Sequence, residues 1–508
     1  MVFLKDNLLC CIKYYNLTQL LHMKLSMLSF LVFLSLAVSG QAPPKSYGAV
    51  PSERQLKWHD TELYGLIHFT PTTFENKEWG YGDADPASFN PTEFDADKIV
   101  AAFKAGGLKG MVLVAKHHDG FALWPTNTTN YNISRSPFRN GKGDMVKEFE
   151  QACRKAGLKF GVYCSPWDRN HPDYGTYEYV KQYREQLREL YTNYGELFMS
   201  WHDGANGGDG YYGGARTTRK IDRNTYYAWD TTWQLTRKLQ PTANIFSDIG
   251  WDVRWVGNEN GFAGETSWST FTPVPAKGES KAFPGNLDHE QNPFGTRNGN
   301  SWVPAECDVP LRKGWFWHPE QKDQVKTPEQ LFDIYLKSVG RGGALDIGIA
   351  PNTKGQLADE DIVSLKGFGE LVQKTFANNL AQKAGLSASD TRGKDFELYK
   401  LTDDDKLTYW ATHDDIKKAT INLEWNENQI IDFIRLREYI QLGQRIEKVT
   451  VESFESGNWV KVGEATSIGA ARIISLNKTV NSRKLRVNIE APTCITLAEL
   501  GCYKKYKP

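Results

Sequence analysis

The sequence predicts a (β/α)8 barrel followed by an all-β sandwich of jelly-roll or discoidin-like type. Over about 310 residues, apolar runs of strand length alternate with amphipathic helical stretches, which is typical of a parallel sheet with right-handed crossovers. Eight candidate strands in that region favour a closed barrel, and a doubly wound open sheet is the main alternative. From about Leu386 the runs become short and alternating, as in an antiparallel sandwich.

The chain begins with a predicted targeting segment, residues 1–41. Leu25 to Gly40, LSMLSFLVFLSLAVSG, follows Lys24 and ends in small residues, as in a cleavable secretory signal peptide. This apolar run is too short and too poorly flanked to predict a membrane span. Met23 is an alternative start of the chain. We therefore expect a secreted or periplasmic protein without stable membrane insertion after cleavage.

The barrel domain is expected over residues 45–380. Its helices begin and end at ordinary signals: the stretch from Asp95 to Ala105 has acidic residues in its first turn and closes at Gly106. After Val256 a long irregular segment extends to about Pro310. The expected strands are Leu63 to Phe69, Lys109 to Lys116, Leu158 to Cys164, Leu197 to Trp201, Ala243 to Ile249, Val253 to Val256, Gly314 to Trp317 and Ala344 to Ala350. The expected helices are Asp95 to Ala105, Met145 to Ala156, Tyr179 to Tyr194, Thr225 to Leu239, Pro328 to Val339 and Asp361 to Phe376.

The sandwich domain is expected over residues 386–508. Short β-type runs, several of them alternating, are separated there by turn residues. These runs are Leu407 to Ala411, Ala419 to Leu423, Ile430 to Arg437, Lys448 to Glu452, Trp459 to Val462, Lys484 to Ile489 and Ile495 to Cys502.

The composition narrows the classes of function. Lys+Arg and Asp+Glu both count 61, so no bulk charge favours nucleic acid or an acidic membrane as a partner. The sequence has 16 Trp and 23 Tyr, many of them beside Gly, His or acidic residues, and aromatic faces with a polar edge suit sugars. The one G-x-G-x-x-G match, Gly208 to Gly213, leads into a polar stretch and does not open a helix, which argues against a dinucleotide site.

The cysteines do not predict a disulfide framework. After signal cleavage five remain, mostly within strand or helix patterns. Only Cys494 and Cys502 are close enough in sequence to suggest a pairing. The five are Cys153, Cys164, Cys307, Cys494 and Cys502.

Polar and aromatic side chains follow several of the predicted strands. Because the carboxyl ends of barrel strands meet at one mouth, we expect these side chains to lie together. The stretch ELFMSWHDGANGGDG breaks into a glycine-rich loop just after Asp203, which leaves room for a ligand beside that carboxylate. The residues at the strand ends are His68, His117, His118, Tyr163, Trp201, His202 and Asp203, with Glu259 further along the chain.

The histidines do not have the spacing of metal ligands. His117 and His118 are adjacent, so on a strand their side chains point in opposite directions, and the sequence has no H-x-H or HExxH motif. Neutral imidazoles can instead donate and accept hydrogen bonds with a polyol while indoles stack on its apolar face. We therefore expect a sugar site with no metal and no cofactor.

Carboxylates at this mouth suggest glycoside hydrolysis. Two are sufficient, one as nucleophile and one as acid and then base. Asp203 fits a fixed nucleophile because its glycine-rich flank leaves the substrate room. The second carboxylate is chosen from Glu259, Glu265 and Asp248, of which Glu259 lies in a Gly-Asn-Glu-Asn-Gly loop that suits a mobile acid.

Six ordered motifs together resemble those of the glycoside hydrolase family 29 α-L-fucosidases. The motifs are IHFT with His68, EWG at Glu78 to Gly80, AKHHDGF at Ala115 to Phe121, LWPT at Leu123 to Thr126, GVYCSPWD at Gly161 to Asp168 and SWHDGANG at Ser200 to Gly207. DVRWVGNENG, Asp252 to Gly261, is similar to the acid/base segment of the branch specific for α-1,3 and α-1,4 linkages. GQRI at Gly443 to Ile446 and TSIGAARI at Thr466 to Ile473 resemble the β-sandwich of that branch. The resemblance covers residues 47 to 505.

The resemblance implies a retaining exo-enzyme that removes terminal L-fucose, with Asp203 as nucleophile and Glu259 as acid/base. The implied substrate is a fucosylated oligosaccharide or glycoconjugate glycan with α-1,3 or α-1,4 linkages in branched, Lewis-type structures. The implied fucose pocket consists of His68, Glu78, Trp79, His117, His118, Tyr163, Trp201 and Trp315.

One departure from the family pattern leaves alternatives open. The segment Gly207 to Ile221 is longer than usual between nucleophile and acid/base, so spacing alone does not choose between Glu259 and Glu265. The alternative functions are a broad-specificity α-L-fucosidase that also cleaves α-1,2 and aryl fucosides, and a fucose-binding protein that has lost catalysis.

Overall fold

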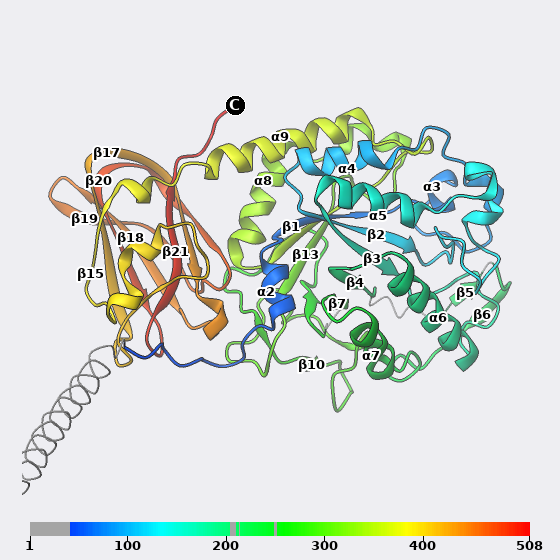
Figure 1. Cartoon of the computed structure of the whole chain (residues 1–508), viewed down its shortest axis with the longest axis horizontal. Helices are drawn as coiled ribbons and strands as arrows, with labels where there is room; N and C mark the ends of the chain where they lie inside the picture. Colours follow the sequence, from blue (N-terminus) through cyan, green and yellow to red (C-terminus); the bar gives the residue numbers. More distant parts are fainter. Residues whose placement is uncertain (1–40, 204–209, 213, 248–250) are drawn as a thin grey trace, which may run out of the picture.

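The structure is a computed structural model that describes residues 41–203, 210–212, 214–247 and 251–508. It contains a barrel and, beside it, an antiparallel β domain (Figure 1). Several subjects of the sequence predictions lie wholly or partly outside the described residues: the signal-peptide segment, half of the Gly208 to Gly213 motif, part of the SWHDGANG motif, part of the Gly207 to Ile221 segment, the end of the predicted strand Ala243 to Ile249, and Asp248.

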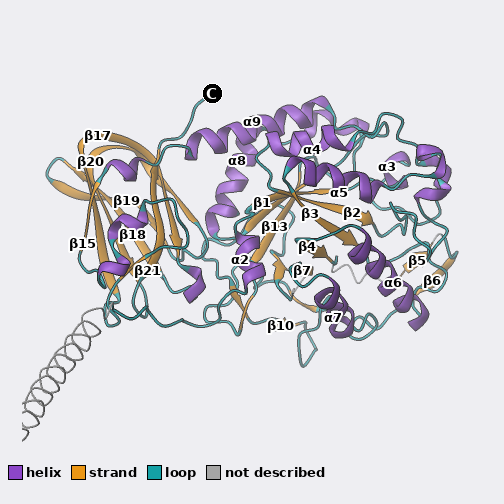
Figure 2. Cartoon of the chain, viewed as in Figure 1, coloured by secondary structure: helices purple, strands orange, loops and turns teal. Residues whose placement is uncertain are grey.

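Eight parallel strands close the barrel, in the spatial order β1-β14-β13-β8-β7-β4-β3-β2. This confirms the predicted fold class. Helices surround the strands (Figure 2). The strands are β1 (Leu63–Ile67), β2 (Gly110–Lys116), β3 (Lys159–Cys164), β4 (Met199–Trp201), β7 (Asn244–Ser247), β8 (Val253–Trp255), β13 (Ala305–Pro310) and β14 (Ala344–Ile349). The helices are α2 (Glu53–His59), α3 (Pro71–Phe74), α4 (Ala96–Ala105), α5 (Met145–Ala156), α6 (Tyr177–Asn193), α7 (Trp229–Leu239), α8 (Pro328–Lys337) and α9 (Asp359–Phe376).

Side chains alternate between the two sides of each barrel strand, as the strand period requires. On β1, Leu63 and Ile67 face outward into the large apolar core shared with the helices. Tyr64 and Leu66 face inward and join a smaller cluster that fills the barrel. Local signals set the helix ends: the Asp144 side chain accepts from the backbone N–H of Lys147, and α5 ends at Gly157 in the left-handed conformation.

The predicted seventh strand, Gly314 to Trp317, is wrong. The strand at that place in the barrel is β13, which lies inside the segment predicted to be irregular. Its inward face carries Glu306 and Asp308, and both are fully buried. This strand lacks the run of apolar residues by which the other strands were predicted. Its acidic side chains can be buried because they bond to residues that are distant in the sequence.

The C-terminal domain is one antiparallel sheet wrapped around its own apolar core, with strand order β16-β21-β17-β20-β18-β19 and β15 added beside β17. Two predicted strands, Ala419 to Leu423 and Ile430 to Arg437, are parts of the single long strand β17, which has register shifts along its length. The strands are β15 (Gly385–Ala388), β16 (Trp410–Ala411), β17 (Lys418–Glu438), β18 (Lys448–Glu455), β19 (Asn458–Ala465), β20 (Arg472–Glu490) and β21 (Thr496–Tyr503).

Among the described residues, three short two-stranded ribbons lie in the segments that connect the barrel elements. They are β5 (Gly210–Tyr212) with β6 (Thr217–Arg219), β9 (Thr270–Phe271) with β12 (Ser301–Trp302), and β10 (Val274–Pro275) with β11 (Leu287–Asp288).

Cys494 and Cys502 are both buried free thiols, so the pairing that their spacing suggested does not form. Within the described part of the chain, no helix is both long enough and apolar enough to cross a membrane.

Candidate active site

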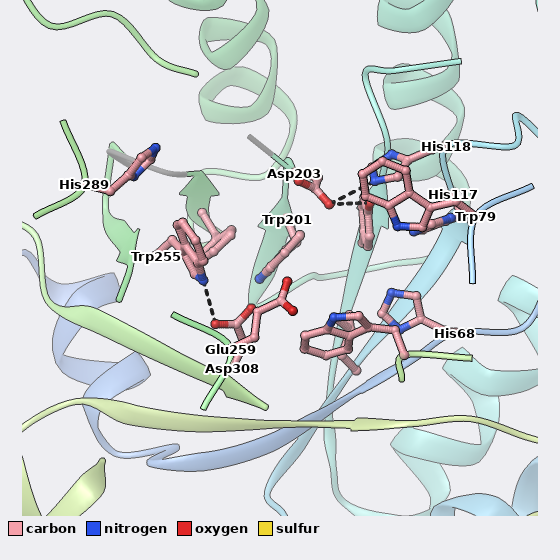
Figure 3. A pocket seen from close by; sticks show the side chains of 14 residues that line it. His68, Trp79, His117, His118, Trp201, Asp203, Trp255, Glu259, His289 and Asp308 are labelled. Atoms are coloured by element: carbon pink, nitrogen blue, oxygen red, sulfur yellow. Dashed lines mark hydrogen bonds and ion pairs between the residues drawn. The ribbon is translucent and has the colours of Figure 1, made fainter. Parts of the chain in front are cut away.

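A cavity of about 300 Å³ opens at the carboxyl ends of the barrel strands. Nine of the ten predicted site residues line it, and the exception is Glu78. In the view of Figure 3, Asp203 lies between His118 and Trp79 on one side and Trp255 and His289 on the other. The lining residues are Leu66, His68, Trp79, His117, His118, Tyr163, Trp201, Asp203, Phe246, Trp255, Glu259, His289, Asp308 and Trp315.

Asp203 lies two residues beyond the end of β4 and is held through one carboxylate oxygen. The Tyr163 hydroxyl donates to Oδ2 at 2.8 Å, and His118 Nε2 lies 3.4 Å from the same oxygen (Figure 3). The intervening His202 is fully buried, and its ring nitrogens contact Tyr183 and Ser200. Strand alternation therefore sends Trp201 and Asp203 towards the cavity and His202 away from it.

Three histidines form one wall of the cavity. The His68 and His117 ring centroids lie 5.3 Å apart, and those of His117 and His118 lie 4.1 Å apart. Burial lowers the pKa of His68 to about 3 and holds the pKa of His117 well below its ordinary value, so both rings are neutral. Within the described residues, Nδ1 of each of these two rings is buried without a hydrogen-bond partner, which indicates a polar ligand.

A serine orients His118. The Ser165 hydroxyl donates to the carbonyl of Trp167 at 2.8 Å and lies 2.7 Å from His118 Nδ1. Because the hydroxyl has only one proton, which it gives to that carbonyl, Nδ1 must be the donor to Ser165. This leaves Nε2 directed at Asp203.

Glu259 lies on the loop that follows β8 and faces the same cavity as Asp203. Asn258 shapes this loop: its side chain donates to the carbonyl of Phe262 and accepts from the backbone N–H groups of Asn260 and Phe262. Burial raises the pKa of Glu259, the carboxylates of Asp203 and Glu78 raise it further, and a hydrogen bond from Trp315 acts in the opposite direction. A carboxyl with a raised pKa can hold a proton for transfer.

Glu265, the other predicted acid/base candidate, does not line the cavity. Its side chain is 75% exposed and pairs with Arg341 and Arg472. The geometry therefore favours Glu259 over Glu265, although spacing in the sequence could not separate them.

Glu78 lies outside the cavity lining and holds the segment that carries Trp315. Its carboxylate accepts from the backbone N–H groups of Trp315 and Phe316 and lies 2.9 Å from His318 Nε2. The segment that carries Trp315 is thus tied to the loop after β1. The neighbouring Trp79 is 51% exposed and packs edge-on against His118.

Five lining residues were not predicted from the sequence: Leu66, Phe246, Trp255, His289 and Asp308. Trp255 lies within the acid/base motif, so its position in that motif was an available signal. Asp308 lies on β13, the strand that the pattern missed, and it accepts from the indole N–H of Trp255 at 2.8 Å (Figure 3). His289 lies in the irregular segment and packs edge-on against Trp255.

Buried acids lie beneath the cavity. Glu306 accepts from the indole of Trp201 at 2.6 Å and from the hydroxyl of Tyr64. Burial raises its pKa to about 7. Burial also holds the pKa values of Asp308 and Asp346, which pair in register on β13 and β14, well above the ordinary value. Acids with raised pKa values therefore anchor two pocket tryptophans and carry less negative charge than ordinary carboxylates would.

These groups match the requirements of glycoside hydrolysis. A polar wall of neutral imidazoles, several indole faces and two carboxylates surround one cavity. In the described ranges, no group of three or more His, Cys, Asp or Glu side chains is arranged to hold a metal ion.

Comparisons with known proteins point to the same chemistry. The family model for alpha-L-fucosidase matches residues 46–375, and a domain of unknown function matches residues 379–503. Alpha-L-fucosidase 1 of Arabidopsis thaliana is 39% identical over 461 residues, covering 89% of this chain and 87% of its own.

Solved structures agree in both fold and family. A glycoside hydrolase 29 family member from an unknown rumen bacterium has a TM-score of 0.79 at 38% identity and covers 92% of this chain and 79% of its own. A Ruminococcus gnavus fucosidase of that family, solved in complex with fucose, has a TM-score of 0.80 at 28% identity and covers 92% of this chain and 98% of its own. The chain therefore belongs to the alpha-L-fucosidases of glycoside hydrolase family 29 and is a glycoside hydrolase that releases fucose.

Proposed function

We propose that the protein is a retaining exo-α-L-fucosidase in which Asp203 is the nucleophile and Glu259 the acid/base. The observation that carries the proposal is that both carboxylates line one cavity from different elements. Asp203 lies at a strand end, where the Tyr163 hydroxyl donates to its Oδ2 and His118 Nε2 lies beside the same oxygen, whereas Glu259 lies on a loop in surroundings that raise its pKa. One group is thus suited to remain ionised and the other to carry a proton.

In the first step Asp203 attacks the anomeric carbon of terminal L-fucose, and the bond to the leaving oxygen breaks. Glu259 gives its proton to that oxygen, so the aglycone leaves as an alcohol and a fucosyl ester forms on Asp203. Tyr163 and His118 hold Oδ2 of the nucleophile during attack.

In the second step Glu259, now ionised, takes a proton from water, and the water oxygen attacks the anomeric carbon from the face opposite the ester. The ester bond breaks and Asp203 is regenerated as a carboxylate. Two inversions give α-L-fucose with net retention.

The histidine wall is the proposed fucose-recognition surface. Neutral His68 and His117 can donate to or accept from sugar hydroxyls, and their buried unpartnered Nδ1 atoms support this role. The indoles of Trp79, Trp201 and Trp315 offer apolar faces for the sugar ring and its methyl group. The fucose complex of the Ruminococcus gnavus relative supports a fucose pocket in this family.

We further propose that the linkage is α-1,3 or α-1,4 in branched glycans. The likeness of the segment from Asp252 to Gly261 to the acid/base segment of that branch supports this proposal. Trp255 and His289 extend the cavity on the side away from Trp79 and provide surface for the leaving sugar (Figure 3). The alternative is a broad specificity that includes α-1,2 and aryl fucosides.

The test compares L-fucose release from Lewis-a or Lewis-x trisaccharide, 2′-fucosylated lactose and an aryl fucoside. We expect release from the branched trisaccharides alone. Efficient cleavage of the linear or aryl substrate would assign the enzyme to the broad-specificity alternative, and no release from any of the three would contradict the proposed reaction.

The proposed location is outside the cytoplasm, secreted or periplasmic, on the evidence of the signal-like segment Leu25 to Gly40. Expression of the full chain followed by N-terminal sequencing of the mature protein tests this: a start near Gly40 or Gln41 is expected, and an uncleaved cytoplasmic product would contradict it.

A further inference from the structure

The chain segment that follows Glu259 is attached to the C-terminal domain. Glu265 through Ser269 form consecutive contacts with residues of the GQRI and TSIGAARI motifs of that domain, which lies beside the barrel (Figure 1). We call these contacts the clamp. Its members on the C-terminal domain are Gln444, Thr466, Ser467 and Arg472.

Arg472 holds Glu265 at both its backbone and its side chain. Its guanidinium donates to the Glu265 carbonyl at 2.7 Å and lies 3.5 Å from the carboxylate. Arg341, from the barrel, binds the same carboxylate and also donates to the carbonyl of Ala263 at 2.7 Å. Glu265 is therefore a bridge between the two domains, which explains its position outside the cavity.

Gln444 pairs with the backbone of the same segment. Its amide oxygen accepts from the N–H of Ser269 at 2.8 Å, and its amide nitrogen donates to the carbonyl of Ser267 at 3.0 Å. Ser467 Oγ accepts from the N–H of Ser267 at 3.1 Å, and the Thr466 and Thr266 hydroxyls lie 2.6 Å apart.

The clamp is largely shielded from water. Gln444, Ser467 and Arg472 are at most 6% exposed. Hydrogen bonds in such surroundings are not weakened by competing water, and breaking them leaves buried groups unpaired. The clamp therefore fixes the backbone of Glu265 to Ser269 firmly.

Glu259 lies between two fixed points. One is the end of β8 at Trp255. The other is Ala263, whose N–H donates to the Lys337 carbonyl and whose own carbonyl accepts from Arg341. Arg341 also pairs with Glu265, which Arg472 of the clamp holds, so the clamp acts on this end of the loop through Glu265 and Arg341. Within this span Gly257 and Gly261 have positive φ values of 88° and 74°, which glycine adopts without strain. These glycines allow the loop geometry but do not impose it, so the geometry depends on the Asn258 hydrogen bonds within the loop and on the contacts that hold its two ends.

We propose that the C-terminal domain acts in catalysis as a positioning device, in which Gln444, Ser467 and Arg472 hold the loop that carries Glu259. This rests on the proposed role of Glu259 as acid/base. Loss of the clamp lets the Glu259 carboxyl move away from the leaving oxygen and leaves Asp203, on β4, in place. The defect therefore depends on how much protonation the leaving group needs.

The experiment measures kcat/KM for two substrates in wild type and in Arg472→Ala. One substrate is α-L-fucosyl fluoride, whose leaving group needs little protonation, and the other is an oligosaccharide that wild type cleaves. We expect a loss of about tenfold on the oligosaccharide, part of the 10²- to 10⁴-fold that acid–base catalysis supplies, and a loss below about threefold on the fluoride. Arg472→Lys should recover part of the oligosaccharide rate.

Arg392→Ala is the matched control. Arg392 is a similarly buried arginine of the C-terminal domain that donates to the carbonyls of Ala42 and Thr412 and pairs with Asp414, outside the clamp. It should lower stability and leave the ratio of the two rates unchanged. If Arg472→Ala gives no folded protein, Gln444→Ala tests the same claim.

The positioning role would be overturned if Arg472→Ala and Gln444→Ala both left the ratio of kcat/KM on the two substrates unchanged, whether or not the two rates fell. Glu259→Gln, measured in parallel, separates this result from the fate of the proposed function. If Glu259→Gln strongly prefers the fluoride but the clamp variants keep the wild-type ratio of the two rates, the positioning role of the clamp is rejected and the acid/base role of Glu259 stands. No preference in Glu259→Gln rejects its acid/base role, and the inference with it.

Discussion

The Asp203 carboxylate, just beyond the end of β4, is positioned by individual side chains of neighbouring strands. Its Oδ2 lies against the Tyr163 hydroxyl and His118 Nε2, and His118 is itself oriented by Ser165. Three elements of the barrel thus fix one carboxylate. Such fixation before the substrate arrives reduces the reorganisation needed during attack.

Asp203→Ala is expected to abolish turnover of every fucoside while the protein stays folded, because the variant lacks the carboxylate that is proposed to form the ester. The rate should fall below about 1% of wild type, since loss of a covalent nucleophile costs several kcal/mol of barrier. Steady-state kinetics with circular dichroism as the folding control checks this. A folded variant with more than that residual activity would disprove the nucleophile assignment.

Glu259 gives a prediction about pH. Its pKa is raised, chiefly by burial, so the protonated acid persists to a higher pH than an ordinary glutamate would allow. In wild type, kcat/KM should fall as the pH rises through that pKa, because the general acid is lost. Glu259→Gln should lower the rate on oligosaccharides about 10²-fold or more and remove this alkaline decline. A pH profile of the variant that keeps the wild-type alkaline limb would assign the acid to another group.

At the scale of elements, β13 is the barrel strand that the sequence pattern did not predict, although its residues bond to two tryptophans of the cavity. Its inward residues Glu306 and Asp308 anchor Trp201 and Trp255 through their indole N–H groups. The strand thus orients aromatic walls on two sides of the cavity. Polar residues replace apolar ones on this strand because each has a buried hydrogen-bond partner.

Glu306 should make stability depend on pH. Its pKa in the folded protein is about 7, raised by burial above the ordinary value of 4.5. The stabilising contribution of its protonated form is complete below the unfolded pKa and is lost as the pH rises through about 7. Glu306→Gln should therefore lose less stability than wild type between pH 4.5 and 7. Urea unfolding at a series of pH values measures this, and parallel pH curves for the two proteins would contradict it.

At the scale of the whole molecule, an ion pair with little exposure joins the barrel and the C-terminal domain in addition to the clamp. Arg437, on β17, pairs with Glu62 beside β1 and with Glu499 on β21. Arg437 holds the pKa of Glu62 well below its ordinary range despite burial, which acts in the opposite direction. This ion pair thus joins the two domains at the amino-terminal end of the barrel strands, opposite the cavity.

Arg437→Ala should lower the free energy of unfolding by about 3 to 5 kcal/mol, because it leaves buried carboxylates without their cation. Since the folded pKa of Glu62 is depressed, its stabilising contribution is present above the unfolded pKa and is lost as the pH falls. The difference between wild type and variant should therefore shrink on acidification. Chemical denaturation at neutral and acidic pH checks this, and a difference that grows towards low pH would disprove the assignment.

The parts of the fold that were predictable are those with a local pattern. β1, β2 and β14 are fully buried runs and β3 is buried except at Lys159. Each follows or precedes an amphipathic helix, and the predicted bounds lie close to the observed ones. β13 was missed because its acidic residues are satisfied by Tyr64, Trp201 and Trp255, which come from other strands. No window along the sequence contains those partners.

The sequence by itself determined the alternation of strands and helices outside β13, the all-β character of the second domain, and the gathering of histidines and Asp203 at strand ends, because alternation and turn signals act between near neighbours. Only the tertiary structure decided that Glu259 faces the cavity while Glu265 joins the domains, that Glu78 supports Trp315 from behind, and that acids lie beneath the pocket. Each of these depends on burial and on partners distant along the chain, which exist only once the barrel has closed.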